Sequence, residues 1–109
     1  MAAAFDTTEQ RILKIIDDNR VTIVDFARDI YDHAELGYKE FRTSGKFTDF
    51  MKSLQLPVQT GLAITGAKAY LNPEKAENAS LALIGELDAL RIPTHAHANP
   101  ETQAAHCCG

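Results

Sequence analysis

The sequence predicts an α/β fold in which two helices precede a β-hairpin and a buried strand. Three observations support this order. Apolar residues recur with the helical period of 3.6 over the first half of the chain, two short strand-like runs follow around a glycine turn, and a continuous apolar run comes after them. The chain has 109 residues, 45% of them hydrophobic and 24% charged. This length and composition predict one small globular domain with its own core.

The first helix is predicted over residues 7–33. Asp6 precedes this segment and Glu9 follows three residues later, which is the pattern of an N-cap with a capping box. Residues 21–24 are β-branched and by themselves favour a strand, but the helical period on both sides favours a continuous helix. The apolar stripe consists of Ile12, Ile16, Ile23, Ala27 and Ile30.

A second helix is predicted to end before Pro57, because proline cannot continue a helix. Its apolar residues recur at i, i+3, i+4 and i+7 and are expected to be core: Phe47, Phe50, Met51 and Leu54. Between the helices, Gly37 interrupts the periodicity. His33, Glu35 and Glu40 surround this glycine, and we interpret them as an exposed inter-helix loop with a structural role.

Strand signals fill the next part of the chain. Residues 58–64 and 67–71 are predicted to form an antiparallel hairpin around Thr65 and Gly66. A polar turn is expected over residues 72–80. Residues 81–84 are continuously apolar, as in a strand buried on both faces, and we expect this strand to extend to about residue 87.

Candidate site residues follow the predicted buried strand, where open α/β sheets form their sites. Glu86 and Asp88 are at i and i+2, so on a strand both carboxylates would face the same way and could meet one metal ion. The alternative is that Asp88 only caps the following turn. After Leu90, residues 91–109 form a loop without periodicity, and loops of this length are usually functional or disordered.

The loop is rich in groups that bind metals. Imidazole and thiolate side chains suit zinc and similar divalent ions. The alternative is a solvated loop with incidental histidines, since no spacing here matches a closed four-ligand zinc motif. Adjacent cysteines do not form an ordinary structural disulfide with each other, which favours a reducing cytoplasm. The candidate ligands are His95, His97, His106, Cys107 and Cys108.

Charge and hydropathy exclude several classes of protein. The formal net charge is −4 and no basic run is present, so nucleic acid is a poor partner. Residues 1–10 lack the basic and apolar regions of a secretory signal. The longest apolar run, residues 81–85, is far too short to span a bilayer. We therefore expect a cytoplasmic protein without a membrane partner.

Four segments, in order along the chain, resemble known sequence motifs. HAELGYKEFRTS (residues 33–44) resembles an H-P-E-L-G-x-E-E-x-x-T-S segment, and LALIGELDALRI (residues 81–92) is similar to a strand L-R-A-D-M-D-A-L-P-I. NPETQAAHCCG (residues 99–109) resembles the approach to an H-A-C-G-H metal loop, and VQTGLAITGAKAYLN (residues 58–72) resembles the hairpin that accompanies these motifs. The motifs are those of the aminoacylase-like zinc metallopeptidases, and the similarity is greatest to the amidohydrolase branch with hippurate, auxin-conjugate and aminobenzoyl-glutamate hydrolases.

The resemblance implies the N-terminal part of a mixed-sheet zinc-hydrolase catalytic domain of the aminopeptidase-like type, with residues 91–109 as an incomplete metal-site loop. The whole enzyme would use two zinc ions, or manganese or cobalt, to cleave the amide bond of N-acyl amino acids or dipeptide-like conjugates. Cys108 falls on the family's cysteine ligand, Asp88 on the acid that supports the site, and Glu86 where other branches place a ligand histidine. Arg91 and Cys107 depart from the family pattern, as does Glu86, which stands where this branch has Asp.

In members of the family, the general-base glutamate and the remaining ligands lie further along the sequence than the position that corresponds to Gly109. We therefore expect the 109-residue chain itself to be inactive. Two alternatives stay open: a stand-alone metal-binding or redox module built on the His/Cys loop, and an interaction domain without activity. We also expect a homo-oligomer, formed by edge pairing of the strand at residues 81–87 or by exchange of a helix.

Overall fold

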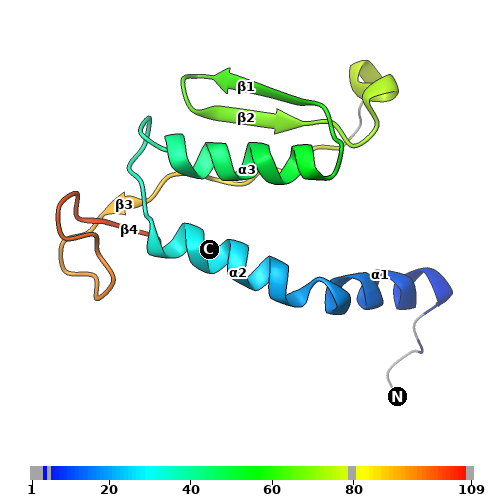
Figure 1. Ribbon diagram of the computed structural model, residues 1–109, viewed down its shortest axis with the longest axis horizontal. Helices are drawn as coiled ribbons and strands as arrows, with labels where there is room; N and C mark the ends of the chain where they lie inside the picture. The colour runs from blue at the N-terminus through cyan, green and yellow to red at the C-terminus, as the bar shows by residue number, and fades with distance from the viewer. Residues whose placement is uncertain (1–3, 5, 79–80, 108–109) are drawn as a thin grey trace. The chain divides into compact units, whose positions relative to one another are not determined.

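The computed structural model describes residues 4, 6–78 and 81–107. Its contacts divide the chain into two units, one ending at Asp32 and the other beginning at His33. Helices and small antiparallel strands are combined, so the predicted α/β class is confirmed at this level (Figure 1). In chain order the elements are α1 (Thr7–Asp18), α2 (Arg20–Asp32), α3 (Phe41–Ser53), β1 (Val58–Leu62), β2 (Gly66–Ala69), the 3-10 helix η1 (Pro73–Asn78), β3 (Leu90–Arg91) and β4 (Ala104–Ala105).

The first helix starts where the sequence predicts. Asp6 is its N-cap: the Oδ1 atom accepts a hydrogen bond from the Glu9 N–H at 2.8 Å, and Glu9 Oε2 accepts one from the Asp6 N–H at 2.7 Å. Each acid therefore satisfies a backbone donor that the first helical turn leaves unpaired. The capping box is confirmed.

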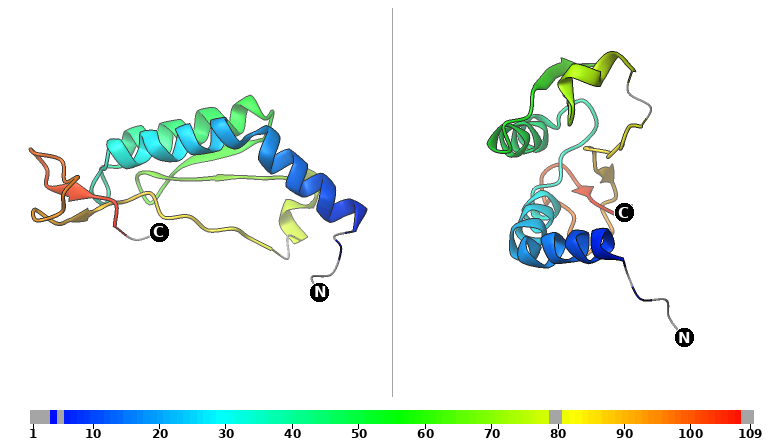
Figure 2. Two further views of the ribbon diagram at one scale, coloured as in Figure 1. Left: turned by 90° about the horizontal axis from the view of Figure 1, so that it is seen from below. Right: turned by 90° about the vertical axis from the view of Figure 1, so that its right-hand side faces the viewer.

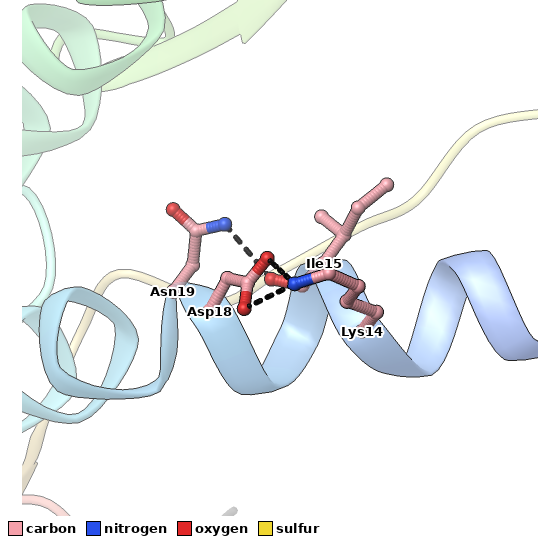
Figure 3. A network of polar contacts seen from close by, with 4 residues as sticks. All are labelled: Lys14, Ile15, Asp18 and Asn19. Carbon is pink, nitrogen blue, oxygen red and sulfur yellow. Dashed lines mark hydrogen bonds and ion pairs between the residues drawn. The ribbon is translucent and has the colours of Figure 1, made fainter.

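The prediction of one unbroken helix over residues 7–33 is wrong at Asn19, where α1 ends and α2 begins (Figures 1 and 2). The Asn19 side chain donates to the Ile15 carbonyl oxygen at 2.8 Å, beside the ion pair of Lys14 with Asp18 (Figure 3). Asparagine competes in this way for backbone groups of the helix. The helical hydrogen-bond pattern resumes directly afterwards, since the Ile23 N–H donates to the Asn19 carbonyl oxygen at 3.0 Å.

Most of the apolar stripe of this first unit is exposed, and Ile30 is half-buried. None of the residues of α1 or α2 is buried. Ile12, Ile16 and Ile23 are 52%, 50% and 49% exposed. The periodicity thus predicts the helices of this unit correctly, apart from the break at Asn19.

In the second unit, α3 packs along a two-stranded antiparallel sheet of β1 and β2 (Figure 1). The hairpin confirms the prediction, with Val58 opposite Ala69. Strand β1 is shorter than expected, because Ile64 has a φ of 84° in the turn. Gly66 makes the close approach possible, since a Cβ there would lie 2.6 Å from the Leu62 carbonyl oxygen. The α3 residues predicted as core are half-buried, except Leu54, which is exposed.

Glu35 caps the N-terminus of α3. Its Oε2 atom accepts from the Arg42 N–H at 3.1 Å, and its Oε1 atom accepts from the Thr43 N–H and the Thr43 hydroxyl, both at 2.6 Å. The carboxylate therefore satisfies two unpaired helix donors and lies at the positive end of the helix dipole. Thr43 is 1% exposed and Glu35 is half-buried, so the cap is partly shielded from solvent.

Glu40 forms a second link, between the start of α3 and the tip of the hairpin. Only 7% of Glu40 is exposed, and its Oε2 atom accepts from the Thr65 hydroxyl at 2.7 Å. Burial alone would raise the pKa of Glu40. Hydrogen bonds from Thr65 and from the backbone of Tyr38, Lys39 and Glu40 outweigh it, so the pKa lies below its ordinary value of 4.5. The prediction that Glu40 is exposed is therefore wrong, whereas its predicted structural role is confirmed.

The predicted buried strand is the main correction to the fold. Residues 81–88 adopt no strand, and Leu81, Leu83 and Ile84 are 80%, 94% and 93% exposed. A strand is completed by backbone hydrogen bonds to a neighbour. Among the described residues the only strand-like partner in this region comes later, where Leu36 forms a parallel bridge with Ala89.

The loop after Leu90 also has more structure than expected. β3 pairs with β4 antiparallel, with Leu90 opposite Ala105 and Arg91 opposite Ala104. Ala104 and Ala105 are 0% and 1% exposed. The sequence gives little sign of this pair, because each strand has only two residues and no alternating pattern.

The Glu35 cap predicts a loss of stability on substitution. Glu35→Gln removes the negative charge from the helix N-terminus and should lower the free energy of unfolding by about 1–2 kcal/mol. Glu77→Gln is the control, because Glu77 is an exposed glutamate near the end of η1. Urea unfolding followed by far-UV circular dichroism measures both. Equal effects of the two substitutions would contradict the cap.

The Glu40 link predicts a dependence of stability on pH. Because folding lowers the pKa of Glu40, its contribution is fully present above the ordinary pKa of 4.5 and is lost as the pH falls through the lower folded value. The difference in unfolding free energy between the wild type and Glu40→Gln should therefore shrink between pH 6 and about pH 3. A difference that stays constant over this range would show that the Glu40 charge contributes nothing.

Candidate functional site

Two of the segments that resemble the hydrolase family lie side by side. The Ala89 N–H donates to the Glu35 carbonyl oxygen at 2.7 Å, and Leu36 forms a parallel β-bridge with Ala89. Ala34 and Ala89 are 8% and 4% exposed and belong to the same apolar cluster, against which Leu36 packs. The HAELG segment (residues 33–37) thus contacts the ELDAL segment (residues 86–90) through a backbone hydrogen bond and through apolar packing.

The segment before the cysteines joins the same cluster. Ala104 is its third buried member, and the pairing of β3 with β4 holds it there. Arg91 Nε also donates to Gln103 Oε1 at 2.9 Å across this pair. Three motif segments that are far apart in sequence therefore meet around Ala34, Ala89 and Ala104, which we call the alanine cluster.

The two carboxylates precede this cluster on an extended, unpaired segment. Glu86 and Asp88 are both exposed. Asp88 lies beside the HAELG turn, since a Cβ built on Gly37 would be 3.9 Å from its Oδ2 atom. Because no strand forms here, the premise that a strand directs both side chains to one face is wrong.

His95 and His97 are close neighbours in the turn between β3 and β4. Their ring centroids are 6.0 Å apart, and the His97 N–H donates to His95 Nδ1 at 3.2 Å. With Nδ1 as acceptor, the neutral His95 ring carries its proton on Nε2. A metal at Nε2 would require the proton to move to Nδ1, which breaks this hydrogen bond. The turn favours a structural role for His95.

His106 differs from the other two histidines. It follows the buried β4, and its Nε2 atom is buried with no hydrogen-bond partner. Buried polar atoms are normally paired, so the described contacts leave the chemistry of this nitrogen unexplained. Cys107 is exposed and not in a disulfide. Cys108, the predicted cysteine ligand, lies outside the described residues.

The described residues do not assemble a metal centre by themselves. Within residues 4, 6–78 and 81–107, no three His, Cys, Asp or Glu side chains lie close enough to hold one ion. An open depression of about 380 Å³ lies elsewhere, and none of the candidate ligands borders it. Its lining residues are Ala69, Tyr70, Leu71, Asn72, Lys75, Ala76, Asn78 and Leu81.

Glu35 and Glu40 have larger roles than the sequence indicates. Each was expected at an exposed loop position, yet each carboxylate organises backbone donors around the start of α3. The available signal was their position just before the helix, where acidic residues favour the dipole. The partner of Glu40, Thr65, could not be identified from the sequence, because the two residues are 25 positions apart.

In the part of the chain that the structure describes, no helix combines the length and the apolar character needed to cross a bilayer. Compared with protein-family models, with curated proteins and with solved structures, the chain matches none of them.

Proposed function

We propose that the chain is the N-terminal part of a metal-dependent amidohydrolase that cleaves the amide bond of N-acyl amino acids or dipeptide-like conjugates. One observation carries the proposal: three of the four segments that resemble this family meet at the alanine cluster. A sequence resemblance in separate segments does not by itself say whether those segments lie close together. Segments that contribute to one site must lie close together, and these three do.

The proposal gives roles to Asp88, Cys108 and His106. Asp88, next to the HAELG turn, supports the site, and Glu86 precedes it on the same segment. Cys108 is the proposed cysteine ligand, with His106 as a further candidate because its buried Nε2 atom is unpaired. A divalent metal, with zinc preferred over manganese or cobalt, would polarise the scissile carbonyl when bound. The described residues by themselves bring no three such ligands together.

The coding sequence gives the most direct test of this proposal. In the resembled metal loop the glycine is followed at once by a ligand histidine. We therefore expect a transcript from the native source to encode His directly after Gly109, followed by sequence for a general-base glutamate and further ligands. A stop codon at that point, or a continuation without histidine, would contradict the proposal and favour the stand-alone module.

Measurements of zinc binding distinguish the roles predicted for the two cysteines. Cys108→Ser should weaken zinc binding by roughly tenfold or more, because it removes a proposed ligand. Cys107→Ser is the matched control and should have little effect, since adjacent side chains on an extended segment point apart. Competition titration with a chromophoric chelator measures both affinities. A larger loss for Cys107→Ser, or equal losses, would contradict the assignment of Cys108.

The 109-residue chain alone should not turn over N-acyl amino acids. It lacks the general base that the resemblance implies, and removing a catalytic group costs several orders of magnitude in rate. The measurement is release of free amino acid from hippurate or an aminobenzoyl conjugate with added zinc or manganese. Metal-dependent turnover on the order of 1 per second would show that the chain is a complete enzyme.

A further inference from the structure

The segment that leads into β3 is extended and exposed. Residues 81–88 adopt no helix or strand, and within the described part of the chain none of their backbone groups forms a hydrogen bond (Figure 2). Leu83 and Ile84 are 94% and 93% exposed, more than any other large apolar side chain that the structure describes. The segment therefore offers both its backbone and its apolar side chains to a second molecule.

We propose that residues 81–85 are a cleavage site for an endopeptidase whose pocket accepts a large apolar side chain. An extended peptide that binds a protein gains affinity from its unpaired backbone groups and specificity from pockets for its side chains. Residues 81–85 already have the extended conformation, so no helix or paired strand has to open before a peptidase reaches the bond. Exposed loop segments are preferred places of proteolytic cleavage for this reason.

The other large apolar residues that are exposed lie in helices, paired strands, turns or bends. Val21 is 72% exposed, but it lies in α2. Tyr38 is 68% exposed, but it lies in the turn that the Lys39 N–H closes by donating to the Leu36 carbonyl oxygen. Leu71 is 79% exposed, but it lies in the bend between β2 and η1. At these positions the chain would have to open locally before it could be cut.

The cleavage is a hydrolysis of one peptide bond. The bond between the carbonyl carbon and the nitrogen breaks, the carbon gains the hydroxyl of water and becomes a carboxylate, and the nitrogen gains the proton and becomes a new amino terminus. The cut separates the β1–β2 hairpin from Glu86 and Asp88 along the chain. The hydrogen bond of Ala89 with Glu35 would then join two separate chains, without the effective concentration that an intact chain provides. Cleavage would therefore weaken the assembly of the candidate site.

Limited digestion of the full chain with thermolysin tests the site, because this peptidase cuts before large apolar residues. Mass spectrometry of the first products should show a cut before Leu81, Leu83 or Ile84. Replacing these three residues together with Asp should slow the loss of intact chain by about tenfold or more, because an apolar pocket then loses the side chain that fits it. Leu71→Asp is the matched control at a similarly exposed leucine, and its rate should stay within about twofold of the wild type.

Glu40→Gln distinguishes cleavage of the folded chain from cleavage after unfolding. It weakens the link of Glu40 to Thr65, which raises the population of unfolded molecules. Cleavage of an already exposed segment does not depend on that population, so the rate should stay within about twofold of the wild type. The proposal would be overturned by a first cut elsewhere, by a triple Asp variant cut as fast as the wild type, or by much faster cleavage of Glu40→Gln. Resistance of the native chain, while the denatured chain is digested, would overturn it as well. These outcomes do not depend on the proposed hydrolase function.

Discussion

Glu35 is the residue on which the second unit depends. Its side chain accepts the N–H groups of Arg42 and Thr43 at the start of α3, and its backbone carbonyl accepts the N–H of Ala89. Glu35 therefore contacts both the start of α3 and Ala89, which comes more than fifty positions after Glu35 in the sequence. Buried backbone groups and the first N–H groups of a helix need such partners, so Glu35 links the position of Ala89 to that of α3.

The Glu35 contacts connect directly to the arrangement of the candidate site. Once Ala89 is held beside Leu36, β3 follows and pairs with β4, and Ala104 completes the alanine cluster. Asp88 comes next to the Gly37 turn for the same reason. The segments that resemble a metallohydrolase are thus brought together by ordinary backbone and capping interactions, before any metal or substrate is considered.

Local signals could be read from the sequence and non-local ones could not. The capping box at Asp6 and the hairpin around Gly66 depend on neighbouring residues, and both were predicted correctly. The strand expected at residues 81–84 needs a backbone neighbour from elsewhere, and the structure leaves it extended and exposed. The burial of Glu40 was missed because glutamate is rarely buried unless it is paired, and its partner Thr65 is distant in sequence.

Amide hydrogen exchange of Ala89 tests the central claim, that Glu35 holds the motif segments together. The account predicts that the Ala89 amide, although it follows an exposed segment, exchanges as slowly as the amides of α3. It also predicts that Glu35→Gln speeds exchange at Thr43 and Ala89 together, because one residue organises both. An Ala89 amide that exchanges at the rate of an unstructured peptide, while α3 stays protected, would show that the alanine cluster does not form.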